Sequence, residues 1–76
     1  MINLRDEIYL KQFGKNLKQI RLSKGFTQEE LSYSSDVSLA QITRLERGVV
    51  NPTLCTLKCL AKGLDITTSE LLKFND

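Results

Sequence analysis

Apolar residues recur every three or four positions along most of the chain, and this spacing predicts α-helices rather than strands. A first helix is expected to start near Asn3 or Asp6 and to end at Lys24. Gly25 can stop it there in the left-handed conformation. At roughly 100° per residue, the core-facing stripe of this helix consists of Tyr9, Leu10, Phe13, Leu17 and Ile20.

The next two predicted helices are short and are marked by polar caps. Residues 27–30 (TQEE) have the form of a capping box, and this helix is expected to end around residues 34–36. Ser38 then caps a third helix, which ends at Arg47 before Gly48. Two short helices joined by a tight turn indicate a helix-turn-helix over residues 28–47, with these apolar anchors: Leu31, Val37, Ile42 and Leu45.

Two more helices complete the pattern. Pro52 suits the entry to a fourth helix over residues 53–63, and a last short helix is expected over residues 68–74, capped by Thr67 or Thr68. We expect their inward side chains to be Leu57, Leu60, Ala61, Leu64, Leu71 and Leu72. The sequence therefore predicts an all-α fold. Ser32 is expected where two of its helices cross closely.

Length and composition fit one small globular domain. The chain has 76 residues, 41% of them hydrophobic and 26% charged. Its first residues include Arg5, Asp6 and Glu7 without a long apolar run, which argues against a signal peptide. No run approaches the roughly 20 apolar residues of a membrane span. We therefore expect cytoplasmic residence and no membrane partner.

The charges are unevenly distributed. Five cations and no acid lie between residues 11 and 28, and Glu46 is the only acid between residues 37 and 64. A basic field of this kind suits a polyanion. For Lys11, Lys15 and Lys18, however, a solvated helix face is the preferred interpretation.

The residues that support catalysis or metal binding are scarce. The chain has no histidine, so a Ser-His or Cys-His nucleophile cannot be assembled. Cys55 and Cys59 are the only cysteines; two thiolates alone do not make a four-ligand zinc site, and a disulfide at this helical spacing is strained. We expect a reduced pair, no metal, no cofactor and no enzymatic activity, with a redox role left open.

The third helix has a face suited to reading DNA. Ile42 and Leu45 point inward, and Leu39 lies on the boundary. The outward side chains are Ala40, Thr43, Arg44 and Arg47. Small residues followed by cations fit the major groove, where Arg44 can pair with guanine. A plain amphipathic helix with a solvated polar side explains this helix alone equally well.

A longer series of motifs runs through residues 13–72. In order, these motifs are Phe13-Gly14, Leu17, Ile20-Arg21, Lys24-Gly25, Thr27-Gln28-Glu29-Glu30-Leu31, Val37-Ser38, Ile42, Leu45-Glu46-Arg47-Gly48, Asn51-Pro52-Thr53-Leu54, Leu57 and Leu60-Ala61. In this spacing they resemble the Cro/repressor-type (XRE-like) helix-turn-helix family. The resemblance implies a compact five-helix bundle of the lambda-repressor-like type, with helices two and three as the reading unit. Residues 1–12 are then an N-terminal extension continuing into helix one, and residues 13–76 the DNA-binding domain.

The resemblance also implies roles for individual residues. Base contacts fall on Ser38, Leu39, Ala40 and Arg44. Phosphate contacts fall on Arg21, Gln28, Thr43, Arg47 and Asn51, with Gln28 either anchoring a phosphate or supporting the recognition helix. Arg21 and Glu46 match a partly buried ion pair that braces helix one against helix three.

The chain departs from the family pattern at three places. Asp36 stands where glycine is usual, because the turn needs a positive φ that Asp tolerates better than most residues. Ser32 and Ser35 replace small or apolar residues, and their hydroxyls can bond back to helix carbonyls. The loop at residues 49–51 lacks lysines, so it should add little to phosphate binding.

Together these observations predict a sequence-specific transcriptional regulator that binds a pseudo-palindromic double-stranded operator as a homodimer, without a small-molecule ligand. At this length it resembles the short controller proteins of restriction–modification systems or small phage-type repressors. The dimer surface is expected to use helix five and the end of helix four, around Thr67, Glu70 and Phe74, and residues 1–12 are expected to add to it. Ile8 and Leu22 lie outside the core stripe, either as isolated surface residues or as part of a partner contact. The alternative function is an antitoxin-like or adaptor-like protein-interaction module that no longer reads DNA.

Overall fold

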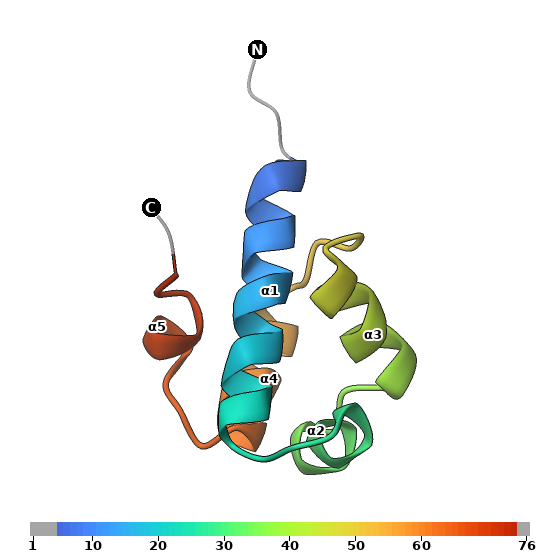
Figure 1. Ribbon diagram of the computed structural model, residues 1–76, viewed down its shortest axis with the longest axis vertical. Helices are drawn as coiled ribbons and strands as arrows, with labels where there is room; N and C mark the ends of the chain where they lie inside the picture. The colour runs from blue at the N-terminus through green and yellow to red at the C-terminus, as the bar shows by residue number, and fades with distance from the viewer. Residues whose placement is uncertain (1–4, 75–76) are drawn as a thin grey trace.

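Five α-helices account for the regular structure of residues 5–74, the part of the chain that the computed structural model describes. In chain order they are α1 (Glu7–Ser23), α2 (Gln28–Ser35), α3 (Leu39–Arg47), α4 (Leu54–Gly63) and α5 (Thr68–Leu71). The long helix α1 stands in the middle, with α3 on one side, α5 on the other and α4 behind it (Figure 1). The predicted all-α, five-helix architecture is confirmed.

Polar side chains begin every helix. Each cap accepts a hydrogen bond from the backbone amide three residues later, and the caps are Asp6, Thr27, Ser38, Thr53 and Thr67. Glu30 completes the predicted capping box by accepting from the Thr27 amide at 2.8 Å. Asp6 is thus the start of α1, while the alternative start at Asn3 lies outside the described residues.

Four helices end with a residue in the left-handed conformation, which the sequence predicts for Gly25 and Asp36 and not for Asp65 (φ 57°), the residue that follows the C-cap of α4. Gly25 (φ 78°) follows α1 and Gly48 (φ 75°) ends α3. Asp36 (φ 61°) ends α2 at the position where the family favours glycine, so this turn forms despite the steric cost of a Cβ atom.

The core lies where the five helices converge. Its fully or almost fully buried side chains are Leu10, Phe13, Leu17, Leu31, Val37, Ile42, Leu45, Leu57, Leu60, Ala61, Leu64 and Leu71. Two members of the predicted stripe are less enclosed, because Ile20 is half-buried and Tyr9 is 38% exposed. Ile8 and Leu22 lie on the surface, off the core as expected.

Small residues allow two helix pairs to approach closely. A Cβ atom added to Gly14 of α1 would overlap the carbonyl oxygen of Leu45 and lie 2.7 Å from that of Glu46. On Gly63 of α4, an added Cβ would lie 2.7 Å from the Cβ of Ser35. Ser35 and Gly63 are therefore the small residues at the close crossing of α2 with α4.

Helix α5 is shorter than predicted. It ends at Leu71 instead of Phe74, and the Phe74 amide donates to the Leu72 carbonyl at 3.1 Å. This turn brings the Phe74 ring back onto α1, with ring centroids 5.1 Å from Tyr9 and 6.1 Å from Phe13. Packing of the aromatic ring against α1 thus takes the place of another helical turn.

Candidate nucleic-acid interface

The two faces of α3 differ sharply in exposure. On the inner face Ile42 and Leu45 are 0% and 1% exposed. The opposite face carries the exposed residues Ala40, Arg44 and Arg47, while Leu39 at the start of the helix is 41% exposed. The helix is thus anchored on one side and open to a macromolecular partner on the other.

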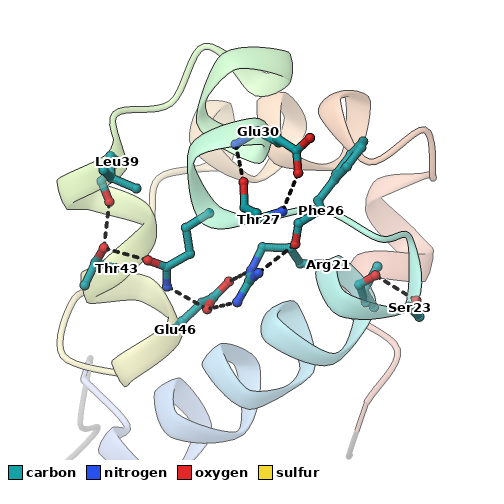
Figure 2. A network of polar contacts seen from close by, with 10 residues as sticks. Arg21, Ser23, Phe26, Thr27, Glu30, Leu39, Thr43 and Glu46 are labelled. Atoms are coloured by element: carbon teal, nitrogen blue, oxygen red, sulfur yellow. Dashed lines mark hydrogen bonds and ion pairs between the residues drawn. The ribbon is translucent and has the colours of Figure 1, made fainter.

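A buried ion pair joins α1 to α3. Figure 2 shows Arg21 and Glu46 in bidentate contact, with Nε to Oε2 at 2.6 Å and Nη2 to Oε1 at 3.0 Å. Their side chains are only 7% and 4% exposed. The third donor, Nη1, reaches the carbonyl oxygen of Phe26 at 2.7 Å, so Arg21 also ties down the segment between α1 and α2.

Gln28 extends this network to α2 by bonding to Glu46 and Thr43, which are labelled in Figure 2. Its Nε2 donates to Glu46 Oε1 at 2.9 Å, and its Oε1 lies 3.2 Å from the hydroxyl of Thr43. The same hydroxyl lies 2.9 Å from the carbonyl oxygen of Leu39, and its single proton serves one of these two acceptors at a time. Thr43 is consequently half-buried against α2, which corrects its predicted outward placement.

These contacts separate the five predicted phosphate ligands into two groups. Arg21 is 5% exposed with three of its nitrogens engaged, and Gln28 and Thr43 are half-buried and bonded to each other. All three side chains position α3. Arg47 and Asn51, in contrast, are exposed near the end of α3.

Serine hydroxyls hold the turn between α2 and α3. Ser35 Oγ donates to the Leu31 carbonyl at 2.6 Å, as predicted, and accepts from the Val37 amide at 3.2 Å. Ser32 Oγ donates forward to the Val37 carbonyl at 2.6 Å instead of back along its own helix. The two hydroxyls thus bind the amide and the carbonyl of Val37, which holds the turn in place. The sequence did not predict this forward bond of Ser32.

The start of α1 packs beside the loop that follows α3. Gly48 approaches α1 so closely that an added Cβ would lie 2.6 Å from the Cα of Lys11. Arg5 Nη2 donates to the carbonyl oxygen of Val49 at 2.8 Å. Sequence reasoning did not anticipate this contact, because nothing local to Arg5 signals a bond to a residue 44 positions away.

The predicted dimer residues lie around α5. Thr67 and Glu70 are exposed and form a second capping box, with the Thr67 amide donating to Glu70 Oε1 at 3.0 Å. Hydrogen bonds from the backbone and then the side chain of Thr67 lower the pKa of Glu70. Phe74 is half-buried against α1, whereas Leu54, not predicted as a contact, is 81% exposed at the start of α4.

Neither a metal cluster nor a membrane helix emerges from the described residues. Within residues 5–74, no three Cys, His, Asp or Glu side chains gather into a metal site. Cys55 and Cys59 are both free and exposed. No helix in that same range is long and apolar enough to cross a bilayer.

Comparison with known proteins returns a consistent group of similarities. A family model described as "Helix-turn-helix" (HTH_3) matches residues 17–71. The uncharacterized HTH-type transcriptional regulator y4dJ of Sinorhizobium fredii is 41% identical over 66 residues, covering 87% of this chain and 86% of the relative.

Two solved structures show the same similarity in three dimensions. The restriction-modification controller protein C.AhdI from Aeromonas hydrophila matches with 37% identity and a TM-score of 0.79, covering 82% of this chain and 94% of that one. The controller protein C.Esp1396I, solved as a tetramer with its natural 35 base-pair operator, matches with 34% identity and a TM-score of 0.78, covering 88% and 92%.

Proposed function

The chain belongs to the helix-turn-helix family, and we propose that it is a transcriptional regulator that binds double-stranded operator DNA in a sequence-specific manner. One observation carries this proposal: α3 is fixed through its inner face while Ala40, Arg44 and Arg47 stay exposed. A helix held in this way can enter the major groove without rearrangement of the fold. The function is binding without catalysis.

Base reading falls to the first half of α3. Ser38, Leu39 and Ala40 lie at its N-terminal end, which approaches base edges in helix-turn-helix complexes. Leu39 and Ala40 offer apolar contact to a thymine methyl group. Arg44, about one turn further along, is long enough to donate two hydrogen bonds to guanine.

Phosphate binding falls to the exposed residues that flank this face. Arg47 and Asn51 are placed for contacts to the DNA backbone, which fix the register of the protein but carry no sequence information. Arg21, Gln28 and Thr43 act indirectly, because their hydrogen bonds hold α3 at its angle to α1 and α2.

We propose a homodimer as the binding unit. A single module makes few base contacts, so two copies on half-sites about 34 Å apart are the expected route to useful affinity. Thr67, Glu70 and Phe74 remain the proposed contact region, and Phe74 is half-buried against Tyr9 of α1. The exposed Leu54 is a further apolar candidate for this interface.

The extent of the similarity supports a relationship to the controller proteins. The chain covers 94% and 92% of the two controller chains described above, so little of either lies outside the similarity. An operator-binding role also agrees with the cytoplasmic residence expected from the sequence. The competing function is the antitoxin-like or adaptor-like module, for which an outward cationic helix is not required.

Selection from random duplex DNA tests the proposal. We expect the chain to enrich a pseudo-palindrome whose two halves are about one helical turn apart. Sedimentation at tens of micromolar protein should give a dimer with and without this DNA. Failure to enrich any sequence would favour the protein-interaction module, and a monomer under both conditions would refute the homodimer.

A further inference from the structure

The outward face of α4 takes no part in the proposed DNA contacts, yet it carries an unusual group of side chains. Its exposed residues are Leu54, Cys55, Lys58, Cys59 and Lys62. The two cysteines are free and stand four residues apart, so they occupy successive turns of the same face. Two thiols on successive turns of one helix face are close enough to be considered as a pair of ligands for one ion.

The spacing selects against a disulfide. Side chains four residues apart on a helix have their Cβ atoms about 5–6 Å apart. A disulfide requires about 3.5–4.5 Å, so closing one would distort α4. A metal ion bound to two sulfurs at about 2.3 Å each needs sulfurs up to about 4.6 Å apart, which rotation about the two Cα–Cβ bonds can provide.

The residues around Cys55 and Cys59 on α4 favour a soft, singly charged metal ion. Residues 54–63 of α4 contain no histidine or carboxylate, so the ligand set is sulfur alone. Thiolates suit Cu⁺ and Zn²⁺ among the common first-row ions, but Zn²⁺ takes four ligands while Cu⁺ is satisfied by two, and Mg²⁺ and Ca²⁺ require oxygen ligands. Lys58 and Lys62 on the same face favour the negative charge that a two-thiolate Cu⁺ complex carries.

We propose that Cys55 and Cys59 form an intrachain chelate for Cu⁺. Two Cu–S bonds form, two S–H bonds break, and both protons go to solvent without any change of oxidation state. The complex carries a net charge of −1. This site goes beyond the proposed DNA-binding function and does not depend on it.

The test is an anaerobic titration of the reduced full chain with Cu⁺ held by the coloured competitor bicinchoninate. We expect the chain to withdraw one Cu⁺ per protein, and X-ray absorption to show two sulfur neighbours. Cys55→Ser and Cys59→Ser should each lower the affinity at least about a hundredfold, because the remaining thiolate loses the effective concentration of its neighbour. Both positions are exposed, so circular dichroism should show unchanged helicity.

A variant that combines Cys59→Ser with Lys62→Cys is the matched control. It keeps two thiols on α4 but places them seven residues, or about 10.5 Å, apart along the helix axis. We expect its affinity to fall to that of the single-cysteine variants. Equal affinity in this variant, or one Cu⁺ shared by two wild-type chains, would overturn the intrachain chelate.

Discussion

The inner face of α3 is buried and bonded to the rest of the fold, whereas its outer face is exposed. The inner face combines two fully packed aliphatic side chains, Ile42 and Leu45, with the buried carboxylate of Glu46. On the outer face, the side chains of Arg44 and Arg47 make neither a hydrogen bond nor an ion pair within the described range 5–74. The first face determines where the helix lies, and the second is left available to determine what it binds.

This difference separates stability from recognition within one nine-residue helix. A substitution on the inner face changes the free energy of unfolding, since it removes packing or leaves a charge unpaired in the interior. A substitution on the outer face should leave folding nearly unchanged and act on DNA affinity alone. Substitutions on the two faces test this separation.

Glu46→Ala should produce the largest effect. It leaves the Arg21 guanidinium buried without its carboxylate, and breaking one side of such a pair costs about 3–5 kcal/mol of unfolding free energy. Urea denaturation followed by circular dichroism measures the loss. The double variant Arg21→Met with Glu46→Leu should recover most of it, because no unpaired charge remains. A single-variant loss below about 1 kcal/mol would contradict the bracing role.

Gly14→Ala should cost about 3 kcal/mol. The added methyl group meets backbone carbonyls of α3, which cannot move aside without shifting the whole helix. Gly25→Ala provides the control, because nothing lies within 4 Å of its added Cβ and only the φ of 78° opposes the change, at about 1–2 kcal/mol. If both variants lost the same unfolding free energy, α1 and α3 would be able to move apart and make room for the added methyl group.

Arg44→Ala should weaken binding to the selected operator by about 1–3 kcal/mol and relax the preference at one base position. Fluorescence anisotropy with the operator and single-base variants measures both effects. Its denaturation midpoint should stay at the wild-type value, because the side chain is exposed. Unchanged operator affinity would remove Arg44 from the base-reading residues.

Arg47→Ala should weaken binding to all DNA sequences by a similar, smaller factor. Loss of one phosphate contact lowers the slope of log affinity against log salt by about one. Anisotropy titrations at several salt concentrations measure that slope. A loss confined to the operator would make Arg47 a base-reading residue instead.

Glu70→Gln should slightly lower stability at neutral pH and leave stability in strong acid unchanged. The folded pKa of Glu70 is lowered, so its contribution is present above the pKa of an unfolded glutamate, about 4.3, and is lost as the pH falls through the folded value. Thermal melts between neutral pH and pH 3 should therefore show a flatter acid decline in the variant. Glu29→Gln, at an exposed glutamate of the first turn of α2, is the control and should retain the wild-type decline.

Local signals in the sequence were enough to place most helix boundaries. Thr27, Ser38 and Gly48 mark their helix ends through bonds or conformations that involve neighbours only a few residues away. The end of α5 could not be placed in this way, because Phe74 turns toward Tyr9, which lies 65 positions earlier in the chain. The direction of Thr43 was misjudged for the same reason, since its partner Gln28 belongs to another helix.

Short-range signals along the chain were therefore enough to predict the positions and order of the helices, the family, and the outward position of Arg44 and Arg47. Periodicity and capping involve only residues that are close in sequence. The resemblance already implied the Arg21–Glu46 pair, whereas the packing of α2 against α3 had to be known before Gln28 could be seen to bond Glu46 and Thr43. Hydrogen bonds between residues far apart in sequence form only when the helices that carry them pack together. That packing depends on close contacts such as those of Gly14 and Gly63, which no periodic pattern in the sequence reveals.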